Sequence, residues 1–409
     1  MHYVYNFLVY LASLGLKLVA PFNKKIKLFV SGRKDSFLKL SDEISVDDKV
    51  IWMHCASLGE FEQGRPIIEK LKESEPSKKI VLTFFSPSGY EVRKDYNFAD
   101  VICYLPLDTI NNANLFLDIV HPEIAIFVKY EFWPNILNQL KKQQIKTILV
   151  SGIFRENQAF FKWYGSWLRK SLKAFSHFFV QDKLSKSLLN SINFNNITLA
   201  GDTRFDRVFE ITKQNNTLNF IDEFKNGHFT IVAGSTWKDD ENILVDYINN
   251  EASANDKFII APHNINPEDI NELKKSIFKK VVLFSEKENV ELKDYQVFII
   301  DTIGILTKIY SYANVAYVGG GYTKSGVHNV LEPATFGIPI IIGPNYYKFL
   351  EAVELVEEGA CFVVEESKKL SVLLNKLKLK NQFVETGKKA GNYVKNKTGA
   401  TNIILKYIK

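Results

Sequence analysis

The sequence predicts an α/β protein that consists of two doubly wound parallel sheets. Short apolar runs alternate with longer helical segments along most of the chain, and parallel strands need crossover connections of that kind. The alternation loosens over 201–224, where 213–217 forms a polar linker, and then starts again. A length of 409 residues also exceeds one ordinary core. We therefore expect two similar halves with a cleft between them.

The strands of the first half are expected at 49–54, 79–85, 101–104, 124–130, 146–151, 176–181 and 197–200. Those of the second half are expected at 229–233, 257–261, 280–284, 296–300, 314–318, 338–342 and 361–364. A helical, lysine-rich tail follows from Lys368. The predicted domains are 1–40 (an apolar helix and its basic flank), 41–212, 213–390 and 391–409, the last being a helix that packs back toward the first domain.

The composition indicates a folded chain with a mild positive charge. Hydrophobic residues make up 46% and charged residues 24%, which is typical of globular proteins. The net charge of +6 suits an anionic substrate or a membrane surface, but is too small to indicate a nucleic-acid partner. The cysteines form no CxxC pair and the histidines no HExxH pattern, so we predict neither a zinc site nor a disulfide framework.

Residues 3–22 are almost entirely apolar and long enough to cross a bilayer. Lys17 and the moderate hydrophobicity equally favour a helix that is half sunk in the membrane interface, and an ordinary buried helix is the alternative. A basic flank belongs on the cytoplasmic side of a membrane, where it attracts anionic lipid. Such a flank follows here: Lys24, Lys25, Lys27, Arg33, Lys34 and Lys39. We therefore expect association with a membrane surface.

The segment 314–344 has the layout of a nucleotide site. An apolar strand leads into Gly319–Gly321, a helix is expected to begin near His328 and to carry Glu332, and a second apolar run follows. Glycines allow a ligand to approach the backbone, and a helix N-terminus attracts anions. Glu332 is placed to accept hydrogen bonds from ribose hydroxyls. A tight turn without a ligand is the alternative, and the missing G-x-G-x-x-G spacing argues against a nicotinamide dehydrogenase.

Polar residues follow two strands of the first half, at the edge where open α/β sheets bind ligands. Glu60 could be a general base if its surroundings raise its pKa, or it could be a favourable acid in the first turn of a helix. Lys129 and Glu131 are expected to share one face of a strand end, with Pro134 in the first turn of the next helix. A structural ion pair is the alternative for these two.

Arg204 closes the first half, where its guanidinium could bind phosphate or carboxylate at the mouth of the cleft. A surface pair with Asp206 is the alternative. In the second half, Ser235 and Thr236 either cap the following helix or hold a phosphate. The remaining strand-end groups are His263 and Asn264, and the segment 301–304.

Taken together, these blocks resemble the Kdo (3-deoxy-D-manno-octulosonic acid) transferases, which add Kdo to lipid A precursors. The resemblance covers nearly the whole chain. It runs through SLGE (57–60), YEFWPN (130–135), GDTRFD (201–206), GSTWKDDE (234–241), DTIG (301–304) and VGGG…GVHNVLEP (318–333). It implies a GT-B fold, in which two Rossmann-like domains face a central cleft, with the acceptor on the N-terminal domain and CMP-Kdo on the C-terminal one. It also implies an enzyme of the inner membrane that faces the cytoplasm.

The resemblance assigns roles to individual residues. Glu60 falls on the catalytic base, and Arg204 on a basic residue, usually lysine, that stabilises the transition state. Lys129 falls on the first position of an E-x-E motif of which only Glu131 remains, so that a lysine would have to counter developing negative charge there. The donor contacts fall on His263, Asn264, Ile303, Gly304, Ile305, Asn329, Val330, Leu331 and Glu332, with Ser235 and Thr236 beside the departing phosphate.

Two further departures concern arginines. The family's PRHP block is Pro262–Ile265 here, so an arginine contact to the donor is missing or comes from elsewhere. An Asn-Ala-Arg run is Ser151–Ile153 here, with Arg155 two places on.

The implied reaction is a single inverting displacement. Glu60 takes the proton from a sugar hydroxyl of the lipid acceptor, the oxygen attacks the anomeric carbon of Kdo, and CMP leaves. We expect no tightly bound metal and no cofactor besides the donor substrate, and the sequence assigns no oligomeric partner. The alternatives are a GT-B enzyme that uses a UDP-sugar, a non-catalytic membrane-bound nucleotide-binding protein and an NAD-dependent oxidoreductase.

Overall fold

A computed structural model describes residues 2–288, 290–379 and 382–409. The chain divides into two compact units: unit 1 is Met1–Arg207 with Lys397–Lys409, and unit 2 is Val208–Asn396. The boundary falls inside helix α10 (Thr203–Ile211), a few residues before the expected division at 212. The chain returns to unit 1 after α18 (Gln382–Asn396), whereas the expected division before residue 391 lies inside that helix.

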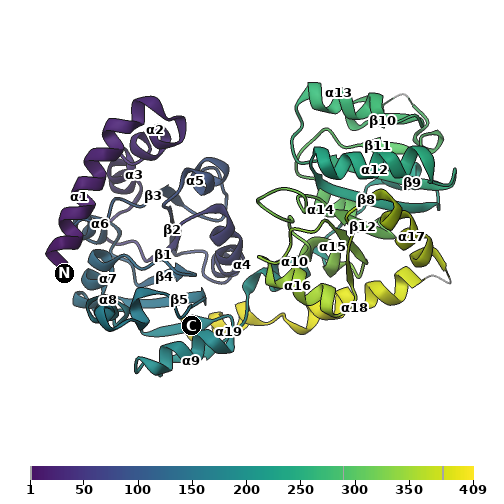
Figure 1. Cartoon of the computed structure of the whole chain (residues 1–409). Coiled ribbons are helices and arrows are strands. Elements are labelled where there is room, and N and C mark those ends of the chain that lie inside the picture. Colours follow the sequence, from purple (N-terminus) through teal and green to yellow (C-terminus); the bar gives the residue numbers. More distant parts are fainter. Residues whose placement is uncertain (1, 289, 380–381) are drawn as a thin grey trace. The chain divides into compact units, whose positions relative to one another are not determined.

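Within the described residues, unit 1 contains a parallel sheet of seven strands in the order β3-β2-β1-β4-β5-β6-β7 (Figure 1). The strands are β1 (Val50–Cys55), β2 (Lys79–Phe84), β3 (Val101–Tyr104), β4 (Ile124–Val128), β5 (Lys146–Gly152), β6 (His177–Val180) and β7 (Ile197–Leu199). The chain first builds outward on one side of β1 and then on the other. The strand order therefore reverses between β1 and β4, which is the place where such sheets bind ligands.

Helices cover both faces of this sheet. They are α1 (His2–Val19), α2 (Lys24–Ser31), α3 (Ser36–Glu43), α4 (Leu58–Ser74), α5 (Pro87–Arg93), α6 (Ile110–Val120), α7 (Pro134–Lys142), α8 (Ser166–Leu172), α9 (Lys183–Ser191) and α19 (Ala400–Ile408). Successive side chains of a strand point to opposite faces. Accordingly, Trp52 packs in the core with Phe116 of α6, whereas Met53 packs with Phe61 of α4 and Ile404 of α19.

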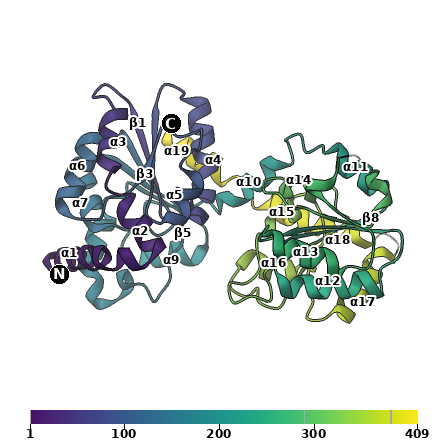
Figure 2. The same ribbon diagram turned by 90° about the horizontal axis from the view of Figure 1, so that it is seen from above.

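Unit 2 repeats the plan with seven strands among its described residues, in the order β10-β11-β9-β8-β12-β13-β14. The strands are β8 (Phe229–Thr236), β9 (Asp256–Pro262), β10 (Val281–Leu283), β11 (Val297–Ile299), β12 (Val315–Val318), β13 (Ile340–Ile342) and β14 (Cys361–Val363). The helices besides α10 and α18 are α11 (Asn219–Lys225), α12 (Lys238–Asn250), α13 (Pro267–Ser276), α14 (Leu306–Tyr310), α15 (Leu331–Thr335), α16 (Leu350–Glu357) and α17 (Ser367–Lys378). Figure 2 shows helices on both faces of this sheet, with α14 on one face and α12 and α13 on the other. Here the strand order reverses between β8 and β12.

The predicted fold class is confirmed, since each expected strand overlaps an observed one in a parallel sheet. Two details of the helices differ. The helix expected near His328 begins at Leu331. The last amphipathic piece is not continuous, because α18 ends at Asn396 and α19 starts at Ala400, after Gly399 with a φ of 117°.

Helix α1 is fastened to unit 1 by a buried polar cluster. Tyr5 donates from its hydroxyl to Asp108 Oδ2 at 2.7 Å, and Asn135 Nδ2 donates to Asn6 Oδ1 at 2.7 Å. Asp108 also accepts hydrogen bonds from the backbone N–H groups of Asn135 and Ile136, both at 2.9 Å. It therefore satisfies the first turn of α7, whose donors have no partner within the helix. One carboxylate thus connects α1 to the first turn of α7.

We predict that Asp108→Ala destabilises unit 1 by about 1–3 kcal/mol, because buried N–H groups of α7 lose their acceptor. Urea unfolding followed by tryptophan fluorescence measures this, since Trp52, Trp133, Trp163 and Trp167 of the five tryptophans lie in unit 1. The exposed neighbour Asn111 supplies the control, and Asn111→Ala should stay within about 0.5 kcal/mol of the parent chain. Equal stability of the two variants would contradict the role given to Asp108.

Candidate active site

Glu60 lies in the first turn of α4, directly after the carboxyl end of β1. Its carboxylate is buried, with 5% of the residue exposed. The backbone N–H of Ser57, the N-cap residue of α4, donates to Glu60 Oε2 at 3.0 Å. The side chain therefore does cap its own helix. Because an ionised carboxylate offers about four lone-pair sites, this bond leaves room to accept a proton.

The surroundings raise the pKa of Glu60 to about 7. Burial is the largest cause, since it removes water from the charged form, and the negative charge of Glu131 acts in the same direction. Hydrogen bonds from the backbone of Ala56 and Ser57 and the positive charge of Lys129 act against them. A carboxylate that takes up a proton near neutral pH has the property that a general base requires.

Lys129 and Glu131 do not share a strand face, so that expectation is wrong. β4 ends at Val128, and the alternation of side chains ends with it. The φ of Lys129 is 69°, which is uncommon for a residue with a side chain. Trp133 Nε1 donates to Glu131 Oε2 at 2.9 Å. The charges of Lys129 and Glu131 both act on the Glu60 carboxylate: Glu131 raises its pKa and Lys129 lowers it.

His54 received no role from the sequence, yet it lies fully buried beside Glu131. Its Nε2 is 3.4 Å from Glu131 Oε2, and its Nδ1 is 2.9 Å from Thr83 Oγ1. Trp52 Nε1 donates to the same Thr83 oxygen at 2.9 Å. Trp133 Nε1 also lies 3.3 Å from His54 Nε2, so the imidazole is held between Thr83 on one side and Glu131 and Trp133 on the other. The sequence does contain a signal for His54, since it is a polar residue within the otherwise apolar strand VIWMHC.

Arg204 is held by Asp202, the residue two positions before it. Its Nε and Nη2 both lie 2.8 Å from Asp202 Oδ2. Asp206 accepts a hydrogen bond from Thr401 N at 2.8 Å, at the start of α19. Gln63 Nε2 donates to Asp202 Oδ1 at 3.2 Å, so Asp202 connects Arg204 with α4. The guanidinium is thus fixed beside the helix that starts at the switch point of unit 1.

In unit 2, the glycine loop after β12 packs backbone against backbone. A Cβ on Gly319 would lie 2.4 Å from the carbonyl oxygen of Ser235. One on Gly320 would lie 2.6 Å from that of Gly326, and Gly320 also has a φ of 90°. The N–H of Gly320 donates to Asp240 Oδ2 at 2.9 Å. The glycines are therefore required by the protein itself, and this N–H already has an acceptor.

The alternative that Ser235 or Thr236 caps α12 is wrong, because neither residue is the N-cap of that helix. Both belong to β8, and the N-cap is Trp237, whose N–H donates to Asp240 Oδ2 at 2.9 Å. Thr236 is buried, and its hydroxyl donates to Glu241 Oε1 at 3.0 Å. Ser235 is half-buried and lies at an irregularity of the strand with a φ of 55°.

Trp237, His263 and His328 form a parallel ring stack that was not foreseen. The centroids of Trp237 and His263 are 4.6 Å apart, and those of His263 and His328 are 4.5 Å apart. Trp237 Nε1 donates to His328 Nε2 at 2.9 Å, so that nitrogen carries no proton. Burial lowers the pKa of both histidines. The stack joins the ends of β8 and β9 to the glycine loop.

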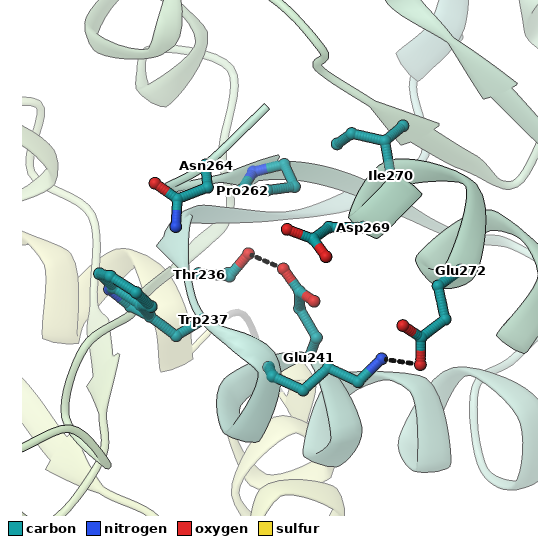
Figure 3. A pocket seen from close by; sticks show the side chains of 9 residues that line it. Thr236, Trp237, Glu241, Pro262, Asn264, Asp269, Ile270 and Glu272 are labelled. Carbon is teal, nitrogen blue, oxygen red and sulfur yellow. Dashed lines mark hydrogen bonds and ion pairs between the residues drawn. The ribbon is translucent and has the colours of Figure 1, made fainter. Parts of the chain in front are cut away.

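Asn264 and Trp237 border a pocket of about 400 Å³ between α12 and α13 (Figure 3). The remaining lining residues are Thr236, Lys238, Glu241, Pro262, Asp269, Ile270 and Glu272. Lys238 Nζ is engaged by Glu272 Oε1 at 2.6 Å. With three carboxylates and one ammonium that is already paired, the pocket repels anions. A phosphate group is therefore not expected inside it, although polyhydroxyl groups could donate to its oxygens.

Glu332 connects the two segments to which the resemblance assigned the donor nucleotide. Its Oε1 accepts from Asn329 Nδ2 at 3.0 Å, and its Oε2 accepts from Thr307 Oγ1 at 2.9 Å. The segment 303–305, which leads into α14, therefore lies beside 329–332. The structure brings these residues together at the carboxyl edge of the sheet.

Individual members of these segments differ in accessibility. Ile303 is 82% exposed and Gly304 has a φ of 98°, whereas Val330 and Leu331 are buried in the core. Only the backbone of Val330 and Leu331 can reach a ligand. The N–H of Leu331, at the start of α15, is capped by Asn329 Oδ1 at 3.1 Å.

Two Rossmann-like domains, each with polar residues at the switch point of its sheet, are the architecture of the GT-B fold class. Among solved structures, a putative UDP-N-acetylglucosamine 2-epimerase from Listeria monocytogenes is similar, with a TM-score of 0.57 and 14% identity over 88% of this chain and 96% of that one. At this identity the likeness concerns the fold alone.

The family model described as 3-Deoxy-D-manno-octulosonic-acid transferase (kdotransferase) matches residues 31–207. A 3-deoxy-D-manno-octulosonic acid transferase of Aquifex aeolicus is 30% identical over 332 residues, which cover 80% of this chain and 85% of the relative. The chain therefore belongs to the Kdo transferase family.

A second relative is a bifunctional glycosyltransferase/methyltransferase of Fusobacterium nucleatum, 27% identical over 372 residues. The match covers 87% of this chain but only 56% of that protein. The chain thus spans little more than half the length of this relative.

The opposed charges around Glu60 lead to a prediction about pH. Activity needs Glu60 deprotonated if it is the base, so the acid limb of kcat/KM for glycosyl transfer should fall near pH 7. Glu131→Gln removes a negative charge, lowers the pKa of Glu60 and should move that limb to lower pH. Lys129→Met removes the opposing positive charge and should move it to higher pH.

Rates measured from about pH 5 to 9 check both directions. Lys186→Met, on the exposed surface of α9, serves as the control and should leave the limb in place. Shifts of equal sign in the two test variants would contradict the electrostatic account.

Proposed function

We propose that the chain transfers Kdo from CMP-Kdo to a hydroxyl of the lipid A precursor lipid IVA, a step of lipopolysaccharide biosynthesis. The observation that carries the proposal is the carboxylate of Glu60, which lies at the switch point of unit 1 with a pKa raised to about 7. Membership of the Kdo transferase family supports this choice of sugar. The proposal makes Glu60 the base.

In the proposed step, Glu60 takes the proton of the acceptor hydroxyl. The hydroxyl oxygen forms a bond to the anomeric carbon of Kdo while the bond from that carbon to the CMP phosphate oxygen breaks. CMP departs with the electron pair, and the configuration at the carbon inverts. No covalent intermediate forms, so the step needs no side-chain nucleophile.

We assign the negative charge that develops on the phosphate to Lys129, Arg204 and donors near Ser235. A guanidinium whose geometry is already fixed, as that of Arg204 is by Asp202, loses little freedom in the transition state. This arrangement uses no metal ion and no cofactor besides the donor substrate.

We assign the nucleotide to the edge of unit 2 that carries the ring stack and Glu332. His263 and Asn264 border it on one side, and the segments 303–305 and 329–332 border it on the other. Glu332 would exchange its bond with Thr307 or Asn329 for ribose hydroxyls. The neutral His263 ring presents a flat surface beside Trp237, which suits contact with a sugar or a base.

We further propose that α1 lies in the plane of the membrane interface of the inner membrane, with the catalytic units on the cytoplasmic side. One helix of the described residues, at Tyr3–Phe22, is long and apolar enough to cross a membrane. One side of it is tied to unit 1 through Tyr5 and Asn6. The other side exposes Phe7, Leu11 and Leu14. A helix held to its domain along one side is suited to lie on a membrane and not to cross it.

The catalytic proposal is tested with Glu60→Gln, lipid IVA and a supply of CMP-Kdo. We expect turnover to fall by about 10²–10⁴-fold, while thermal stabilisation of the chain by CMP persists, because Glu60 belongs to unit 1 and the nucleotide is assigned to unit 2. Products are counted by mass spectrometry. Turnover should continue in EDTA.

UDP in place of CMP is the matched ligand control, and it should not stabilise the chain. Stabilisation by UDP alone would favour a UDP-sugar enzyme. Undiminished turnover of Glu60→Gln would exclude Glu60 as the base. CMP binding by a wild-type chain that shows no turnover would favour a non-catalytic nucleotide-binding protein.

Membrane association is tested by sedimentation with vesicles of phosphatidylethanolamine and phosphatidylglycerol. Phe7→Asp with Leu14→Asp should abolish co-sedimentation, because charges would replace the exposed apolar face of α1. Leu184→Asp, on the exposed surface of α9, should leave it unchanged. An N-terminal tag that is protected from protease added outside the vesicles would show that α1 crosses the bilayer and would contradict the interfacial proposal.

A further inference from the structure

Unit 1 contains an apolar pocket of about 290 Å³ beside α1. Its walls come from three separate parts of the chain, which are α1, the segment from α2 to α3, and the loop between β3 and α6. The lining residues are Ser13, Leu16, Lys17, Phe29, Val30, Arg33, Lys34, Phe37, Pro106, Leu107 and Asn112. A volume of this size is near the lower limit of ligand pockets in proteins.

The charged residues of the pocket all carry the same sign. Lys17, Arg33 and Lys34 line it, and no acidic side chain does so among the described residues. Lys17 and Lys34 are exposed, so their ammonium groups lie at the rim, whereas the phenylalanine and leucine side chains form the walls. An apolar pocket with a cationic rim is complementary to a hydrocarbon chain that carries a phosphate at one end.

Arg33 is built into the wall in an unusual way. Its guanidinium donates to three backbone carbonyls, those of Phe29 at 2.8 Å, Phe85 at 2.6 Å and Leu105 at 3.0 Å. It also lies 3.6 Å from the centroid of the Phe29 ring. Burial lowers the pKa of Arg33 to about 9, which still leaves it charged at neutral pH. The contacts satisfy its hydrogen bonds without neutralising its charge, so a positive charge stays at the pocket.

The pocket lies at the same edge of the sheet as Glu60. Pro106 and Leu107 follow β3, and Phe85, which Arg33 binds, follows β2. The ring of Phe85 packs on Trp133 with centroids 4.5 Å apart, and Trp133 donates to Glu131 next to Glu60. A lipid whose chain enters here has its head group at the carboxyl edge, where the acceptor hydroxyl must be deprotonated.

We propose that this pocket holds one acyl chain of the acceptor lipid, with a phosphate of its head group at Lys17 and Lys34. The inference rests on the proposed function and adds to it the place where the acceptor is recognised. A chain in the pocket fixes the position of the acceptor beside the protein while the rest of the lipid remains at the membrane surface next to α1.

The first experiment fills the pocket or reverses its charge. Val30→Trp and Lys34→Glu should raise KM for lipid IVA by roughly tenfold, since several methylene groups or a phosphate contact lose their partner, and should leave kcat nearly unchanged. KM for the disaccharide bisphosphate without acyl chains should not respond to Val30→Trp. Lipid IVA is presented in detergent micelles, so that binding to a membrane does not enter KM.

Two variants outside the pocket are matched to these changes. Val92→Trp on α5 places the same ring at an exposed position, and Lys186→Glu on α9 makes the same change of charge. Both should behave as the parent chain. An equal effect of Val30→Trp and Val92→Trp, or an equal effect of Val30→Trp on acylated and deacylated acceptors, would overturn the proposal.

A second experiment does not depend on turnover. Lipid IVA with a diazirine at the end of one acyl chain is bound, illuminated and mapped by mass spectrometry. Labels are expected in 13–17, 29–37 and 106–112, and they should be reduced in Val30→Trp. Labels confined to the outer face of α1 would overturn the proposal even if the enzyme transfers Kdo. Labels in the pocket of a chain that shows no transfer would support the pocket and count against the proposed reaction.

The experiments also distinguish the acceptor lipid from bulk phospholipid, which is the other candidate occupant of the pocket. It would be indicated if Val30→Trp weakened sedimentation with vesicles that contain no acceptor while KM for micellar lipid IVA stayed the same. That outcome would also overturn the assignment to the acceptor.

Discussion

Parallel strands that are joined by right-handed crossovers all end at one edge of their sheet, and this constraint decides where the chemistry of the chain can lie. In unit 1 the strand order reverses between β1 and β4, and Glu60 and Lys129 follow these two strands. In unit 2 it reverses between β8 and β12, and Trp237 and the glycine loop follow them. At each reversal the crossovers leave in opposite directions, so no helix covers the gap. Each unit therefore has a candidate site where the strand order of its sheet reverses.

The strands could be predicted from the sequence because a parallel strand is buried on both faces and reads as a short apolar run. The places where local prediction failed are turns whose geometry depends on distant partners. Trp237 is the N-cap of α12 because Asp240 accepts its N–H, and Asp240 is held in turn by Gly320 and Tyr317. Nothing in the letters GSTW favours tryptophan over serine or threonine as a cap.

The candidate site shows the same difference between what the sequence predicts and what depends on distant partners. Its residues were found because strand ends can be located in the sequence. Their partners were not found, since the pairs join residues far apart in the chain, such as His54 with Thr83 and Trp237 with His328. The partner of Arg204 could not be predicted either, although the candidates are close in sequence, because Asp202 and Asp206 are both two residues away. Tertiary contacts distinguish the two carboxylates: Asp202 also accepts a hydrogen bond from Gln63, and Asp206 accepts one from Thr401 at the start of α19.

Lys129 is the position where the chain departs from the family's acidic pattern, and the electrostatics around Glu60 give the departure a physical meaning. Burial and Glu131 raise the pKa of Glu60, and Lys129 opposes them, with a result of about 7. A carboxylate at position 129 would act with Glu131 and push the pKa higher still, leaving less of the base ionised at neutral pH. The lysine offsets that effect, because its positive charge lowers the pKa of Glu60. The exchange of acid for base at this position therefore favours the ionised form of Glu60, which is the form that the proposed step requires of its base.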